Sequence, residues 1–160
     1  MSIVQTNLAN TYDKLERREE ALQIKWDVYF GRFKLHGAEH EATILAANNV
    51  AVSLAISMRF KEARVLLRKM IPVARRVLGD SNAITLKMRW TYAGALYEDD
   101  DATLDDLREA VMRIEETERV TRRVLGGAHP LTVAMEESLR RSRAALAARE
   151  KSRETPSAGA

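Results

Sequence analysis

Three histidines are the side chains of this sequence that most readily suggest metal or acid–base chemistry. His36 and His40 have the four-residue spacing of two zinc ligands on one helix, but Gly37 lies between them and interrupts any helix there. Neither this pair nor His129 has an evident further ligand beside it. We therefore expect the histidines to cap helices at turns, and we expect no metal site.

The densest acidic segment does not have the pattern of a cation loop either. Asp99, Asp100 and Asp101 are followed by Asp105 and Asp106, without the alternating ligand spacing and central glycine of a calcium loop. No glycine-rich phosphate loop is present, and no serine is marked out as a nucleophile. The absence of cysteine excludes disulfides, thiolate metal sites and a cysteine nucleophile. These residues mark out no catalytic centre, and we expect no cofactor.

Length and composition indicate one ordinary folded domain. A chain of 160 residues can bury a sizeable core, and its 46% hydrophobic content does not indicate disorder. The 26 basic and 23 acidic residues leave a net charge of only +3, which by itself does not imply a nucleic-acid partner. No apolar run approaches the roughly 20 residues of a membrane span, and the start lacks a signal-peptide layout. We expect a cytoplasmic protein.

The sequence repeats itself. Gly37 and Gly79 are 42 residues apart, and Gly126 follows 47 residues later. Several short motifs keep the same spacing, among them Asn7-Leu8-Ala9, Asn49-Val50-Ala51 and Thr91-Tyr92-Ala93, and also Glu20-Ala21, Glu62-Ala63 and Glu109-Ala110. Proline and glycine are scarce and helix formers dominate. A fixed period in this range is typical of a helical repeat array.

Residues that typically start or end helices predict seven helices in the sequence. The three spaced glycines suit helix C-termini, Pro130 suits a first helical position, and Thr103 with Asp106 suits a capping box. The longer third repeat is explained by an acidic insert over 98–106, in the turn between two helices. The predicted helices cover about 3–15, 18–35, 41–58, 61–78, 82–98, 104–125 and 130–150.

These motifs resemble the tetratricopeptide repeat of the kinesin light chain type. The closest segment is Val124-Leu125-Gly126-Gly127-Ala128-His129-Pro130-Leu131-Thr132, and the Asn-Leu-Ala and Glu-Ala motifs match the two helices of the unit. The third repeat departs from it with Thr91-Tyr92-Ala93, and the last unit has only its first helix. The resemblance implies an all-α, right-handed α-solenoid of about 3.5 repeats that binds a peptide or protein in a concave groove made by the first helices. It also implies that the protein is not an enzyme.

The resemblance also divides the chain. Residues 1–150 form the repeat domain, with repeats at about 3–36, 40–78 and 82–125 and a cap helix at 130–150. The composition of 151–160 predicts a disordered tail. By register, the residues that face the groove are Asn10, Lys14, Asn48, Val52, Lys87, Trp90, Gly94, Tyr97 and Arg141.

This mixture of side chains suits recognition. Asn48 can clamp a peptide backbone, the aromatic rings offer rigid contact area, the cations would select acidic groups, and Gly94 leaves room for a bulky side chain. For Asn48 and Trp90 a purely structural role stays open, Trp90 as a core residue between the second and third repeats.

Two other uses of the surface stay open. Arginines crowd the 59–76 segment and the end of the chain, where they could contact nucleic acid, although the small net charge favours a peptide or protein partner. The first helix also exposes Ile3, Val4 and Leu8, through which end repeats could self-associate.

Overall fold

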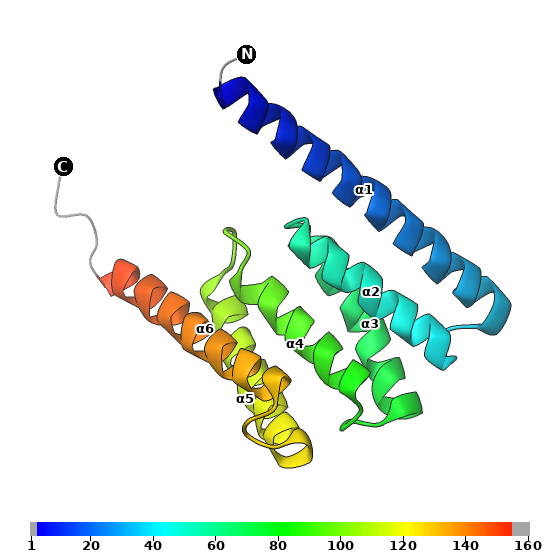
Figure 1. Cartoon of the computed structure of the whole chain (residues 1–160). Coiled ribbons are helices and arrows are strands. Elements are labelled where there is room, and N and C mark those ends of the chain that lie inside the picture. The colour runs from blue at the N-terminus through cyan, green and yellow to red at the C-terminus, as the bar shows by residue number, and fades with distance from the viewer. Residues whose placement is uncertain (1–2, 155–160) are drawn as a thin grey trace.

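The structure is a computed structural model that describes the backbone of residues 3–154 and the side chains of residues 17–153. In this part of the chain every element of secondary structure is an α-helix, as the sequence predicts (Figure 1). Its six helices are α1 (Ile3–His36), α2 (Glu41–Ile56), α3 (Phe60–Leu78), α4 (Ala83–Tyr97), α5 (Leu104–Leu125) and α6 (Pro130–Glu154). The predicted number of seven is therefore wrong.

The missing break lies in α1, which is one continuous helix where the repeat register predicts two. Between α2 and α3 the chain turns because Met58 adopts a positive φ of 58°, two residues after α2 ends at Ile56. The equivalent stretch of α1, 42 residues earlier, is Leu15-Glu16-Arg17-Arg18, in which every residue is a good helix former. Repeat spacing alone therefore does not make a turn where the local residues favour helix.

The helices form two layers. Figure 1 shows α2, α4 and α6 side by side in one layer, with α3 and α5 behind them. Each helix contacts the next one along the chain, and α4 also contacts α2 and α6. Alanines at the contacts are fully buried and let the helices approach closely. They include Ala47 and Ala51 of α2, Ala63 of α3, Ala93 of α4 and Ala110 of α5. The first-helix layer is thus α2, α4 and α6.

Three equivalent corners begin these first helices. Gly37, Gly79 and Gly126 have φ values of 80°, 93° and 91°, which strongly favour glycine at each corner. The residue before each following helix caps it: His40 Nδ1 and His129 Nδ1 each accept an N–H at 3.1 Å, and Asn82 Oδ1 accepts one at 2.8 Å. The capping role predicted for His40 and His129 is confirmed. His36 instead stacks on His40, with ring centroids 4.3 Å apart.

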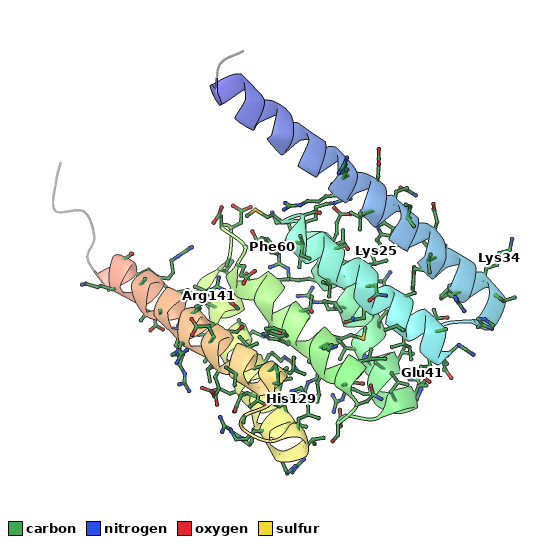
Figure 2. All side chains as sticks on the ribbon, in the orientation of Figure 1. Lys25, Lys34, Glu41, Phe60, His129 and Arg141 are labelled. Carbon is green, nitrogen blue, oxygen red and sulfur yellow. The ribbon has the colours of Figure 1, made fainter. Side chains whose placement is uncertain are left out.

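The C-terminal half of α1 packs as a second helix would. Leu22 and Tyr29 are buried against the array, and the Tyr29 hydroxyl lies 3.9 Å from Met70 Sδ of α3. Lys25, which is labelled in Figure 2, donates to Ser53 Oγ of α2. The start of α1 projects past the array (Figure 1), so the predicted first pair is not formed.

The acidic insert binds the α4–α5 turn to α3 through hydrogen bonds and an ion pair. Thr103 and Asp106 form the predicted capping box, and the hydrogen bond from Thr103 lowers the pKa of the Asp106 carboxyl. Arg64 of α3 donates to Asp99 Oδ2 and to the Ala95 carbonyl, each at 3.2 Å, and the Arg64 and Asp99 side chains are mostly buried. The insert therefore has a structural role.

The last helix is longer than the sequence predicts. α6 continues to Glu154, beyond the predicted end at 150, so the disorder predicted for 151–160 is wrong for its first residues. Lys151, Arg153 and Glu154 are good helix formers, and Ser152 Oγ donates to the Ala148 carbonyl at 2.9 Å. Residues 155–160 lie outside the described part of the chain.

We expect Asp99→Ala to lower the free energy of unfolding by about 2 kcal/mol, because it leaves the mostly buried Arg64 guanidinium without its carboxylate. Asp101→Ala is the matched control, since Asp101 pairs at 3.0 Å with Lys61 where both side chains are exposed. Urea unfolding followed by circular dichroism measures both. Equal effects of the two substitutions would contradict this role of Asp99.

Candidate functional site

A hollow runs along the first-helix layer. One cavity of about 210 Å³ is lined by Val52, Ala55 and Ile56 of α2, Trp90, Thr91, Gly94, Ala95 and Tyr97 of α4, Glu98, and Ser138 and Arg141 of α6. A second cavity of about 690 Å³ shares several of these residues and continues to Met58, Phe60, Ala144 and Ala145. We call the two together the α2–α4–α6 groove. It contains five of the predicted site residues: Val52, Trp90, Gly94, Tyr97 and Arg141.

Trp90 holds one wall of this groove in place. Its Nε1–H donates to Ser138 Oγ at 2.9 Å, which joins α4 to α6. The ring is half-buried against a small apolar cluster that includes Leu86, Leu131 and Met135. Trp90 therefore lines the cavity and also packs between α4 and α6. This packing joins the third repeat to the last helix, and not the second repeat to the third as the structural alternative had it.

Gly94 forms an open part of the groove. No heavy atom beyond its own helix backbone lies within 4 Å of the position that a Cβ would occupy. The space beside it adjoins Val52 of α2 and Tyr97 of α4 in the same cavity. An incoming apolar side chain could occupy this space, whereas a longer side chain at position 94 would fill it.

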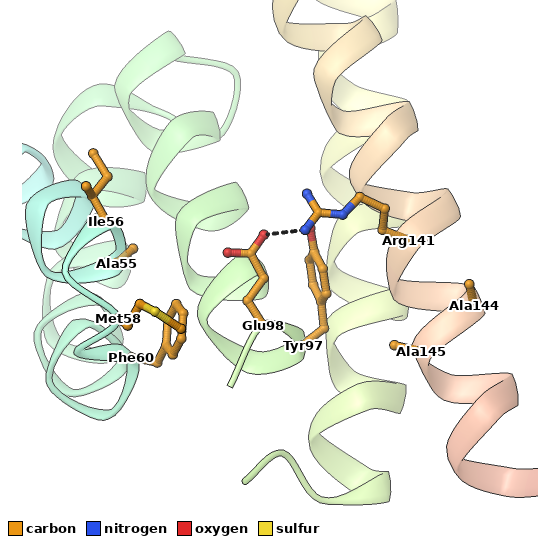
Figure 3. A pocket seen from close by; sticks show the side chains of 9 residues that line it. All are labelled: Ala55, Ile56, Met58, Phe60, Tyr97, Glu98, Arg141, Ala144 and Ala145. Carbon is orange, nitrogen blue, oxygen red and sulfur yellow. Dashed lines mark ion pairs between the residues drawn. The ribbon is translucent and has the colours of Figure 1, made fainter. Parts of the chain in front are cut away.

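The polar end of the groove is built around Arg141 (Figure 3). The Arg141 guanidinium lies 5.7 Å from the centre of the Tyr97 ring and 3.5 Å from Glu98 Oε1. Burial raises the pKa of the Tyr97 hydroxyl, so Tyr97 is neutral at physiological pH. Across the cavity lie Ile56, Met58 and Phe60, which makes that side apolar (Figure 3).

Two further predicted residues that the structure describes, Asn48 and Lys87, do not line the groove. Asn48 lies one turn before Val52 on α2 but is only 6% exposed, and its Oδ1 atom is buried without a hydrogen-bond partner among the described residues. Lys87 of α4 is exposed but lines neither cavity. The side chains of Asn10 and Lys14 lie outside the described part. The cavities therefore do not support the groove assignment of Asn48 and Lys87, and they do not test that of Asn10 and Lys14.

Two functional groups of the groove were not anticipated from the sequence. Ser138 lies one helical turn before Arg141 on α6, and that spacing could have indicated a shared face. Glu98 belongs to the acidic insert, which the sequence analysis places in the turn between two helices. Only the packing of α4 on α6 brings these two side chains to Trp90 and Arg141.

The described residues offer no other obvious chemistry. Among them, no group of three or more histidine or acidic side chains is arranged to hold a metal ion. In the same part of the chain, no helix combines the length and apolar character that crossing a membrane requires.

The fold and the groove define a class: an array of antiparallel helix pairs with a hollow along its first helices. Residues 43–84, which include most of α2 and all of α3, match the family model of the tetratricopeptide repeat. No curated protein matches the chain. The match supports the predicted tetratricopeptide repeat, and such repeats generally act in protein–protein interaction.

We expect Gly94→Ala to raise the free energy of unfolding by about 0.5–1 kcal/mol, because alanine favours helix and its Cβ meets open space. Gly31→Ala in α1 is a matched control with equally open surroundings and should gain a similar amount. Thermal unfolding measures both. Destabilisation by Gly94→Ala alone would show that the space beside Gly94 is filled.

Proposed function

We propose that this protein is a non-catalytic interaction module that binds a peptide or a partner's segment in the α2–α4–α6 groove. We further propose that the array is a right-handed solenoid of the kinesin light chain-like type and acts in the cytoplasm. The observation that carries the binding proposal is the convergence of Val52, Trp90, Gly94 and Tyr97 on one cavity.

The chemistry of the groove suggests the kind of ligand. The open space beside Gly94 suits a bulky apolar side chain, and the apolar wall at Ile56 and Phe60 suits a second one. Rigid aromatic rings such as Trp90 and Tyr97 are common binding hot spots. We propose a dissociation constant in the micromolar range, which corresponds to about −8 kcal/mol.

Arg141 would select an acidic group on the ligand. Its pair with Glu98 is long, at 3.5 Å, and both side chains are exposed. An exposed pair of this kind contributes little to stability, so a ligand carboxylate could replace Glu98 at small cost. The proposed ligand is therefore a segment with bulky apolar residues beside an Asp or Glu.

The nucleic-acid alternative gains no specific support. Four arginines, Arg68, Arg75, Arg89 and Arg113, line a cavity of about 500 Å³ between α3, α4 and α5. Three of them pair with carboxylates: Arg75 with Asp80, Arg89 with Glu116 and Arg113 with Glu109. The fourth donates to a tyrosine hydroxyl. Their charge is largely compensated within the protein.

The binding proposal is tested with peptides selected from a random phage-displayed library against the full chain. We expect enriched peptides that combine bulky apolar residues with an acidic one. Gly94→Leu fills the cavity and should raise their dissociation constant at least about tenfold, because the ligand side chain loses its space. Isothermal titration calorimetry measures the change.

The control for this test is Gly31→Leu, which adds the same side chain at an open helical glycine outside the groove. It should leave the affinity unchanged, and circular dichroism should show both variants folded. Peptides that bind Gly94→Leu as tightly as the unaltered chain would exclude the groove as their site.

A further inference from the structure

An exposed apolar stripe runs along the C-terminal half of α1. Ile24 is 63% exposed and Val28 is 49% exposed, and Ala21 and Leu35 are exposed on the same side of the helix. We call these four residues the outer stripe. It lies on the opposite side of α1 from Leu22 and Tyr29, which pack on the array.

Three of these positions are buried in the next second helix. Counting 42 residues forward, Ala21, Ile24 and Val28 correspond to Ala63, Leu66 and Met70 of α3, all of which are buried. A further 47 residues on, the equivalents of Ala63 and Met70 are Ala110 and Thr117 of α5, which have no exposed surface, whereas Arg113 is exposed. The equivalents of Leu35 are the exposed Val77 and Val124. The part of the outer stripe that a repeat of this kind covers is therefore Ala21, Ile24 and Val28.

The helix that normally covers this surface can be named. On α3, the side with Arg64 and Arg68 faces the next pair, because these residues bond the Ala95 carbonyl and the Tyr92 hydroxyl of α4. α3 also contacts the helix of its own pair, α2, and Ala63 on this other side has no exposed surface. Leu66 and Met70 on the same side lie beside α1, since Leu66 lines a cavity with Trp26 and the Tyr29 hydroxyl contacts Met70. The outer stripe of α1 lacks such a first helix.

The chain carries that first helix, but not where it can reach its own stripe. Residues 3–15 hold the first-helix motif Asn7-Leu8-Ala9, in register with Asn49-Val50-Ala51 of α2. Because α1 runs without a break from Ile3 to His36, this segment continues the helix axis and does not fold back. A second copy of the chain can supply the same segment to the stripe.

We propose that two copies of this chain form a dimer by exchanging residues 3–15, each segment packing antiparallel on the outer stripe of the other copy. The exchange is reciprocal, so both copies complete their first helix pair through one two-fold interface. The segment contains one acidic and one basic residue, Asp13 and Lys14, so its net charge does not oppose an apolar contact. This inference is independent of the peptide groove.

The first test is the mass in solution. Light scattering after size-exclusion chromatography should give twice the 18.1 kDa chain mass at tens of micromolar protein. A mass of one chain at that concentration would overturn the proposal, because the first pair would then be closed within a single copy or left open.

The second test asks which residues meet. The chain has no cysteine of its own, so any disulfide must join the two cysteines that are introduced. By register, Gln5 and Val28 take the places of Ala47 and Met70, two core residues of α2 and α3. A Gln5→Cys copy and a Val28→Cys copy with different tags, refolded together and oxidised, should form a disulfide between chains. Absence of this link, or a link only within a chain carrying both cysteines, would overturn the exchange.

The third test uses a matched pair of charges. Val28→Lys should raise the dimer dissociation constant at least about tenfold, because it places a charge in the apolar contact. Val133→Lys is the control, since Val133 of α6 is 50% exposed, like Val28, but lies far from α1 in the array. Circular dichroism checks that both fold. An equal response of the two variants would contradict the proposed interface.

Discussion

The packing of each second helix against two first helices is the contact on which the whole array depends. α3 contacts its own first helix α2 and the next one, α4. Buried alanines such as Ala63 allow this close approach, while Arg64 and Arg68 reach α4 through hydrogen bonds. Because α3 and α5 pack on one side of the layer formed by α2, α4 and α6, these three helices lie side by side and the other face of the layer is free. The groove is a consequence of that arrangement.

The same contact explains the two ends of the array. At the C-terminal end, α6 covers α5 and α4, and its polar residues form many ion pairs, such as Arg143 with Glu115. At the N-terminal end, α1 covers α2 with one face but has no first helix on the other. An end helix with a polar outer face stabilises an array alone, whereas an apolar outer face needs a further partner.

The sequence predicts the parts of this fold that local residues determine. Gly37, Gly79 and Gly126 mark equivalent corners because their positive φ values favour glycine, and Thr103 with Asp106 marks the start of α5. Five of the nine site residues predicted from register line one groove: Val52, Trp90, Gly94, Tyr97 and Arg141. The break predicted in α1 failed because the repeat period suggested a turn that Leu15-Glu16-Arg17-Arg18 does not make. The burial of Asn48 and the contacts of Ser138 and Glu98 depend on how helices pack, which periodicity does not specify.

The groove is tested most directly by the indole N–H signals of the two tryptophans in a ¹⁵N–¹H NMR titration with a library-selected peptide. Trp90 lines the groove and bonds Ser138, whereas Trp26 lies on α1, away from it. Binding in the groove should shift the Trp90 signal progressively with peptide concentration and leave the Trp26 signal in place. A shift of Trp26 with an unmoved Trp90 would place the ligand elsewhere and contradict the assignment of the α2–α4–α6 groove as the binding surface.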